Sequence, residues 1–157
     1  MGALAPLPMS NAQGFDPATI TAEEFSRLVG SMSEEQLGDA IHGIGTGRVL
    51  DRVFEQFTAR FRPEHAGGVD AESQFLIRDG SDEHPYLVVI RNARCDVQPA
   101  RGKEPRVTLV AELLPFVKLV TGHAEGANLF MTGKLRVAGD LVFALRLLSF
   151  FDRPKPV

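Results

Sequence analysis

Few side chains in this 157-residue chain are of the types that bind metal ions or perform catalysis, and they lie far apart. The four histidines are His42, His65, His84 and His123, and no two of them have the spacing of metal ligands. The single cysteine, Cys95, falls in a predicted strand, where a cysteine is more often a small buried apolar residue than a nucleophile. The sequence therefore predicts no metal site and no cofactor.

The other polar candidates each have a simpler structural interpretation. Asp140 is a candidate general acid or base, but it also stands where a helix N-cap is expected. Tyr86 either packs within a strand or contacts a ligand, and Lys134 and Arg136 either meet a carboxylate or head group or face solvent. The glycine-rich residues 43–47 form either a phosphate-binding nest or, as we favour, a joint between two helices.

The stretch around which the rest of the chain is organised covers residues 129–151. Residues 129–137 alternate in the period of a strand with one dry face, made of Leu129, Met131, Gly133, Leu135 and Val137. Gly139 interrupts this strand, and Asp140 is placed to cap a following helix. Residues 141–151 are almost wholly apolar. A helix of this composition has to lie under other elements, face a partner or line a cavity.

Residues 130–141, FMTGKLRVAGDL, resemble the signature of the sterol carrier protein type 2 family, which comprises small sterol- and lipid-transfer domains. The shared pattern is an aromatic or Met pair, one spacer, Gly-Lys-Leu, a basic-aliphatic alternation, Gly-Asp and a Leu/Ala-rich helix. A looser resemblance extends back to about Arg48. The resemblance implies an antiparallel sheet, helices packed on it, and a hydrophobic tunnel between the two.

The remaining elements agree with an α+β fold. Capping boxes at Thr21 and Ser33 open two short helices, and residues 113–120 form another. Residues 48–62 form an amphipathic helix, which either packs on a sheet, as we favour, or docks on a membrane. Strands are predicted at residues 72–78, 85–91, 93–97 and 106–111, and their short loops favour antiparallel pairing. With the strand at 129–137, these elements predict a mainly antiparallel five-stranded sheet with helices packed on it, and the resemblance implies that the two enclose a hydrophobic tunnel.

Composition and charge narrow the function classes. The length suits one domain, which we predict over residues 21–152, after a flexible arm at 1–20 and before a short tail at 153–157. The formal net charge of −3 offers no basic field for nucleic acid. No apolar run reaches the length of a transmembrane helix, and no secretory signal or other targeting signal is evident. We therefore expect a cytoplasmic protein.

An excess of apolar surface without attached chemistry is what a lipid carrier needs. We expect a non-catalytic carrier of sterols, fatty acyl groups or acyl-CoA-type lipids, with membrane contact as a secondary role. The alternative is a small enzyme, of the isomerase or cyclase type, acting on a steroid or lipid in the same cavity; it would need an acid or base inside. Alternation and helical spacing predict a set of apolar residues that face the space between sheet and helices, where they either fill a solid core or, as the resemblance implies, line a cavity. These residues are Phe75, Ile77, Leu87, Val89, Val107, Leu109, Phe116, Leu119, Met131, Leu135, Val137, Leu141, Ala144, Leu145 and Leu148.

The opposite face of the predicted sheet is also apolar. It comprises Leu76, Val88, Ile90, Val110 and Phe130. Such a patch is larger than a soluble monomer usually exposes, so we expect it to be covered. The covering element is either the pair of N-terminal helices, which we favour, or a second copy of the chain in a homodimer.

Overall fold

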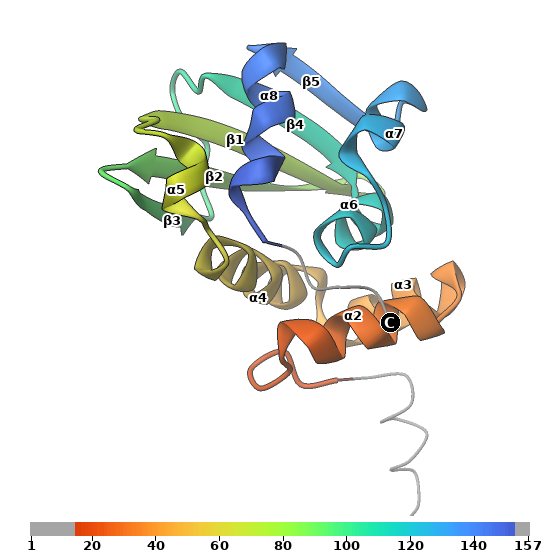
Figure 1. The fold of residues 1–157 in the computed structure, drawn as a ribbon. Helices are drawn as coiled ribbons and strands as arrows, with labels where there is room; N and C mark the ends of the chain where they lie inside the picture. Colours follow the sequence, from red (N-terminus) through yellow and green to blue (C-terminus); the bar gives the residue numbers. More distant parts are fainter. Residues whose placement is uncertain (1–14, 153–157) are drawn as a thin grey trace, which may run out of the picture.

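A computed structural model describes residues 15–152 of the protein (Figure 1). The helices are α2 (Ala22–Ser31), α3 (Glu34–Ile44), α4 (Thr46–Ala59), α5 (Pro63–Ala66), α6 (Leu113–Val120), α7 (Gly126–Met131) and α8 (Leu141–Leu147), with a 3-10 turn, η1 (Leu148–Phe150). The strands are β1 (Ala71–Asp79), β2 (Asp82–Arg91), β3 (Arg94–Gln98), β4 (Val107–Glu112) and β5 (Leu135–Gly139). The predicted α+β class is confirmed.

The strands form one sheet in the order β3-β2-β1-β4-β5. Neighbouring strands are antiparallel except β1 and β4, which pair in parallel with Phe75 opposite Leu109. The sheet is therefore mixed, although mainly antiparallel as predicted. The parallel pair arises because the chain crosses from β3, at one edge, to the far side of β1 before it forms β4.

The helices α4, α6 and α8 cover one face of this sheet, which we call the inner face (Figure 1). Phe54 of α4 joins the two layers: its ring stacks on Tyr86 at 4.2 Å and on Phe116 at 5.1 Å between ring centroids. The Tyr86 hydroxyl donates a hydrogen bond of 2.6 Å to Asp51, and burial raises the pKa of this tyrosine strongly. Tyr86 is thus a packing residue of the core, the first of its two interpretations.

The amphipathic helix α4 packs inward. Leu50, Val53, Phe54 and Phe57, four residues of its apolar stripe, are buried in the core. The helix begins at Thr46 and ends at Ala59, a shorter and earlier span than predicted. Gly45, with φ 117°, lies between α3 and α4, so the glycine-rich segment is a helix joint.

Helices α2 and α3 begin at the predicted capping boxes. The Thr21 and Ser33 side chains accept from the amides of Glu24 and Gln36, and both reciprocal bonds are present. These helices pack on α4 and α6, where the Ser26 hydroxyl donates to the carbonyl of Thr121 over 2.8 Å. The expectation that they cover the second face of the sheet is wrong, because their apolar residues are already used on the helical side.

The loop between β3 and β4 covers part of the second face of the sheet, around Gln74 and Leu87, whereas Leu76, Val89 and Val110 stay partly exposed. Gln74, buried on this face, donates to the carbonyl of Ala100 (3.0 Å) and accepts from the amide of Gly102 (2.7 Å). Val88 and Ile90 do not lie there: they oppose Ser73 and Ala71 and share the inner face with them. Leu76 and Val110 lie on the second face as predicted, and Leu87 and Val89 take the places there that were predicted for Val88 and Ile90.

The strand predicted at 129–137 is shorter in the structure. Residues 126–131 form α7, Gly133 turns the chain with φ 77°, and β5 begins only at Leu135, opposite Ala111. The strand β4 ends at Glu112, where α6 begins, so residues 129–133 would have no strand to pair with. They satisfy their backbone groups in a helical turn instead.

At the N-terminal end of the described chain, residues 15–20 are packed. Phe15 lies 5.2 Å from Phe25 between ring centroids, and the carbonyl of Ile20 accepts hydrogen bonds from Arg52 and Gln56. The remaining residues of the predicted arm, 1–14, and the predicted tail, 153–157, lie outside the described residues. The limits of the domain stay a prediction. None of the helices within residues 15–152 is long and apolar enough to cross a bilayer.

Candidate functional site

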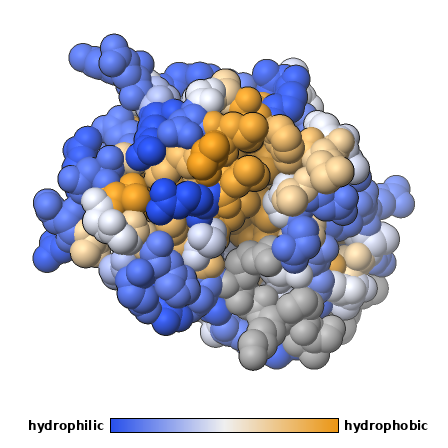
Figure 2. Space-filling model, turned by 45° about the horizontal axis from the view of Figure 1, so that its top comes forward, coloured by the Kyte–Doolittle hydropathy of each residue, from blue (hydrophilic) through white to orange (hydrophobic). Residues whose placement is uncertain are grey.

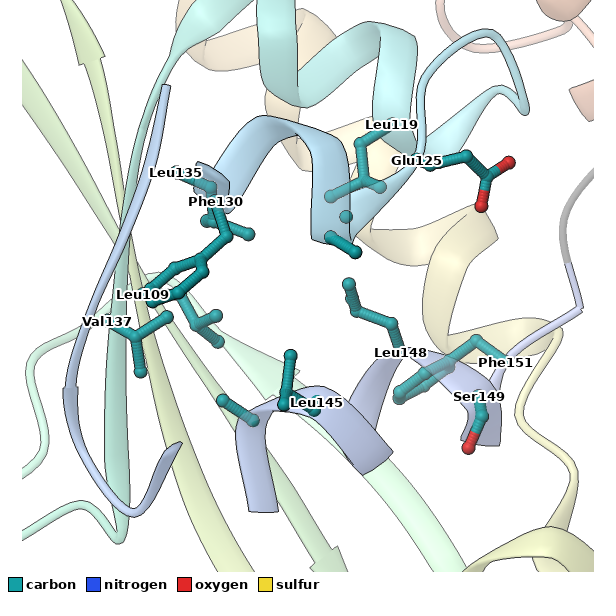
Figure 3. A pocket seen from close by; sticks show the side chains of 13 residues that line it. Leu109, Leu119, Glu125, Phe130, Leu135, Val137, Leu145, Leu148, Ser149 and Phe151 are labelled. Atoms are coloured by element: carbon teal, nitrogen blue, oxygen red, sulfur yellow. The ribbon is translucent and has the colours of Figure 1, made fainter. Parts of the chain in front are cut away.

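A cavity of about 520 Å³ lies between the inner face of the sheet and the helices α6, α7 and α8 (Figure 3). It is partly open to solvent, and a hollow edged by hydrophobic side chains is visible on the surface (Figure 2). Its wall consists of Leu109, Leu119, Glu125, Gly126, Ala127, Phe130, Leu135, Val137, Ala144, Leu145, Leu148, Ser149 and Phe151.

Each wall of the cavity follows from local structure. Leu109 of β4 and Val137 of β5 are register partners, so both side chains project from the inner face. Opposite them, Asp140 starts α8 by accepting from the amide of Phe143 over 2.9 Å, which turns the chain back over the sheet. Gly126 lets α7 approach closely, since a Cβ there would lie 2.6 Å from Leu148 Cδ1.

Part of the predicted set of cavity residues lies in this wall: Leu109, Leu119, Leu135, Val137, Ala144, Leu145 and Leu148. Phe75, Ile77, Val107 and Phe116 also project inward but are buried in the core and contribute no surface to the cavity. Whether the wall residues contact a ligand stays a prediction.

The predicted positions of four residues are wrong. Phe75 opposes Tyr86, so Leu87 and Val89 point to the second face, with Leu87 against Gly102 of the β3–β4 loop. The sequence could not decide which face of the sheet Leu87 and Val89 point to, because residues 86–90 are apolar without interruption and fit either register. Met131 is 83% exposed at the end of α7, and Leu141 is half exposed at the start of α8; neither lines the cavity.

Sequence analysis missed several wall residues. Gly126, Ala127 and Phe130 have the spacing of one helical face, a signal hidden by the interpretation of this segment as a short connection and a strand. Phe130, predicted on the second face, instead reaches into the cavity toward the inner face (Figure 3). Glu125, Ser149 and Phe151 were not singled out, and nothing in their local pattern indicates a cavity.

Polarity is concentrated at one end of the cavity. Leu109, Leu135 and Val137 lie on the side of the sheet, whereas Glu125 and Ser149 lie at the other end in Figure 3. The Ser149 hydroxyl donates to the carbonyl of Arg146 over 2.6 Å, as a serine near a helix end commonly does. This geometry does not activate the hydroxyl as a nucleophile, because its proton is directed to a carbonyl and not to a base.

The other polar candidates have structural roles. Asp140 caps α8 and lies 3.0 Å from Arg106; these hydrogen bonds, from Phe143 first and Arg106 second, lower the pKa of its carboxyl group. Burial raises the pKa of the Cys95 thiol to about 12, which disfavours the thiolate that a nucleophile needs. Within residues 15–152, no three His, Cys, Asp or Glu side chains are grouped so as to hold a metal ion.

Comparison with known proteins identifies the family. A family model described as the SCP-2 sterol transfer family matches residues 54–152. The chain belongs to the SCP-2 sterol transfer family. The predicted resemblance is thus confirmed, and the matched residues include all five strands, the helices α6, α7 and α8, and every wall residue of the cavity.

Relatives of this SCP-2 family chain include two mammalian proteins. The chain is 25% identical over 118 residues to sterol carrier protein 2 of Rattus norvegicus, covering 70% of this chain and 21% of the relative. It is 27% identical over 107 residues to sterol carrier protein 2 of Homo sapiens, covering 67% of this chain and 18% of the relative. The chain therefore spans about a fifth of the length of these relatives.

Solved structures confirm the SCP-2 fold. Sterol carrier protein 2 like 2 of Aedes aegypti superposes with a TM-score of 0.56 at 19% identity, over 67% of this chain and 98% of that chain. Sterol carrier protein 2 of Yarrowia lipolytica superposes with a TM-score of 0.53 at 22% identity, over 67% of this chain and 88% of that chain. A sec-alkylsulfatase of Pseudomonas sp., Pisa1, superposes with a TM-score of 0.60 at 16% identity, over 87% of this chain and 24% of that chain. At these identities the likeness concerns the fold alone.

Proposed function

We propose that this protein is a non-catalytic carrier that binds a sterol, a fatty acid or an acyl-CoA-type lipid with its apolar part in the cavity. The observation that carries the proposal is the cavity itself. Its volume of about 520 Å³ lies within the range of ligand sites, roughly 300–1,000 Å³. Its wall is mostly aliphatic and aromatic, with Glu125 and Ser149 at one end.

Apolar burial is sufficient to explain binding in such a site. Transfer of hydrocarbon from water contributes about 25 cal/mol per Å² of buried area, and it requires no directed hydrogen bond along the ligand. The grouping of polar atoms at one end favours a ligand with one polar group and a long apolar body. Family membership supports this class of ligand, as does a solution structure of palmitated SCP2L2 from Aedes aegypti, which has the same fold.

A small enzyme acting on a steroid or lipid is the second candidate. Glu125 favours it, since it places a carboxyl group, a candidate acid or base, in the wall of the cavity. The carrier remains the better supported function, because the chain belongs to the SCP-2 sterol transfer family and the cavity wall is apolar apart from Glu125 and Ser149. A cytoplasmic location and a homodimer stay predictions without further support.

Organic extraction of the purified protein, followed by mass spectrometry, tests the carrier function directly. We expect a stoichiometric sterol, fatty acid or acyl lipid in the extract, or saturable binding of a fluorescent fatty acid to the delipidated protein. Turnover of a steroid or lipid that is lost in Glu125→Gln, with lipid binding unchanged, would establish the enzyme instead.

A cavity-filling variant locates the site. Ala144 is buried in the wall, so Ala144→Phe places a ring in the empty volume and should reduce fatty acid affinity by more than about tenfold. The control is Ala138→Phe, the same change at an exposed position of β5 outside the cavity wall, which should bind like the parent. Equal affinity of both variants would place the ligand elsewhere.

A further inference from the structure

A serine and a histidine join the N-terminal helix α2 to the connection between α6 and α7. Ser26 of α2 is fully buried, and its hydroxyl lies 3.3 Å from Nε2 of His123, as a nucleophile lies near its base. The hydroxyl, however, donates to the carbonyl of Thr121 over 2.8 Å, and Nε2 lies 2.8 Å from the carbonyl of Ser26. Because a carbonyl oxygen only accepts, Nε2 carries a proton and cannot serve the serine as a base. The pair is therefore a structural contact.

These two hydrogen bonds fasten residues 121–123 to the backbone of α2. Gly30 lets the imidazole ring lie against this helix, since a Cβ at position 30 would be 2.8 Å from Cε1 of His123. On the other side, α6 ends at Val120, and the amide of His123 donates to the carbonyl of Lys118 over 2.8 Å. The connection is thus held between α2 and the end of α6.

The fastened connection leads directly into the wall of the cavity. Glu125, Gly126 and Ala127, which belong to this wall, follow His123 closely in the chain. The helix α7 has 6 residues, and a helix this short is not stable by itself. Its position therefore depends on the segments at its two ends, which are the strand β5 on one side and the connection bonded to α2 on the other.

We infer that His123 is a positioning residue, through which α2 holds the α7 wall of the cavity in the shape that binds lipid. This inference rests on the proposed function, because lipid affinity is its readout. A wall that is in place before the ligand arrives needs no ordering during binding, which raises the affinity. The family match begins at residue 54, so α2 lies outside it, and the N-terminal helices add to the shared domain a control over its cavity.

An isosteric pair of substitutions tests the hydrogen bond of His123. In His123→Gln, the amide nitrogen is as many bonds from Cβ as Nε2 is in histidine, so it can donate to the carbonyl of Ser26. Methionine has nearly the same length but no donor. We expect His123→Met to weaken the binding of a fluorescent fatty acid by about fivefold, and His123→Gln to bind like the parent. The titrations are made at a temperature at which circular dichroism shows both variants folded.

A change on the other side of the same contact gives an independent test. Gly30→Ala places a Cβ against the His123 ring and should displace it, which weakens binding by about fivefold as well. Because both changes act through one contact, the double variant should bind about as weakly as either single variant. Lys118→Met is the control. It removes an ion pair of 2.6 Å with Glu34 that also joins the N-terminal helices to α6, and it should leave the affinity unchanged.

Hydrogen exchange shows where the effect of His123→Met lies. The amide of Leu129 donates to the carbonyl of Glu125 within α7, and it should exchange faster in this variant, whereas the amides of β1 keep the rates of the parent. Faster exchange throughout the sheet would overturn the positioning role, because His123 would then stabilise the whole fold.

The binding data separate this role from the carrier function. Equal affinity of the parent and His123→Met, or equally weak binding by His123→Gln and His123→Met, would overturn the positioning role and leave the carrier function in place. A parent protein that binds no fatty acid and yields no lipid on extraction would overturn the carrier function itself.

Discussion

A single glycine decides how closely the two helices at the cavity approach each other. Gly126 is the first residue of α7, and a Cβ at this position would meet the far end of the Leu148 side chain. Leu148 lines the cavity and has empty volume beside it. An added methyl group is therefore expected to displace Leu148 into the cavity, with little disturbance of the backbone.

Gly126→Ala should consequently weaken ligand binding more than folding. We expect fatty acid affinity to fall by about tenfold, equivalent to the contacts of one or two methylene groups. The free energy of unfolding should change by less than about 1 kcal/mol, because alanine favours the helix while Leu148 readjusts. Fluorescence titration and thermal melting measure the two quantities.

Gly38→Ala is the matched control for Gly126→Ala. Gly38 lies within α3, and a Cβ added there would meet nothing within 4 Å, so alanine should stabilise the helix by roughly 0.5–1 kcal/mol and leave binding unchanged. Unchanged affinity in Gly126→Ala would show that Leu148 does not take up ligand space.

At the scale of the secondary-structure element, the backbone of the turn between β2 and β3 is strained at Ala93. Arg91 pairs with Arg94, which leaves Asn92 and Ala93 as a two-residue hairpin loop, with φ of 54° and 61°. These are the angles of a type I′ turn, which favours Asn followed by Gly. Asn92 meets this preference, but the Cβ of Ala93 is unfavourable in the left-handed region.

Ala93→Gly should therefore stabilise the protein. We expect the free energy of unfolding to rise by about 1 kcal/mol, with a higher denaturant midpoint and an unchanged slope. Asn92→Gly is the control and should give a smaller gain, since asparagine tolerates this conformation. A loss of stability in Ala93→Gly would mean that the turn differs from the one described.

At the scale of the whole molecule, the N-terminal helices complete the core beside the sheet. Phe25 and Val29 of α2 and Leu37 and Ile41 of α3 are buried with residues of α4 and α6 in one apolar cluster. The family match begins only at residue 54, so this layer precedes the shared domain. The cavity lies on the other side of α6, next to α7 and α8.

Deletion of residues 1–43 should uncover α4 and α6. We expect the free energy of unfolding to fall by more than about 3 kcal/mol, because several large side chains lose their buried contacts, and the protein to associate. Deletion of residues 1–13 removes none of the described contacts and serves as the control. A 44–157 fragment that is monomeric by light scattering and melts like the parent would contradict this role.

The sequence by itself determined those features that depend on residues close together in the chain: two helix starts, the family motif and the cap of α8. Capping boxes at Thr21 and Ser33 fixed two helix starts, because the side chain and the backbone amides that it binds are within one turn. Residues 130–141 indicated the family, which the family model confirms, and with it the α+β fold. The Asp140 cap followed from its neighbours alone.

Tertiary structure decided what depends on distant partners. The face of Leu87 and Val89 is set by pairing with β1, which an uninterrupted apolar run cannot indicate. Residues 129–131 became helical because β4 ends before it could pair with them. The cavity lies where α6, α7 and α8 leave a space over β4 and β5, so that apolar residues became core in one place, as Phe75, and cavity wall in another, as Leu109.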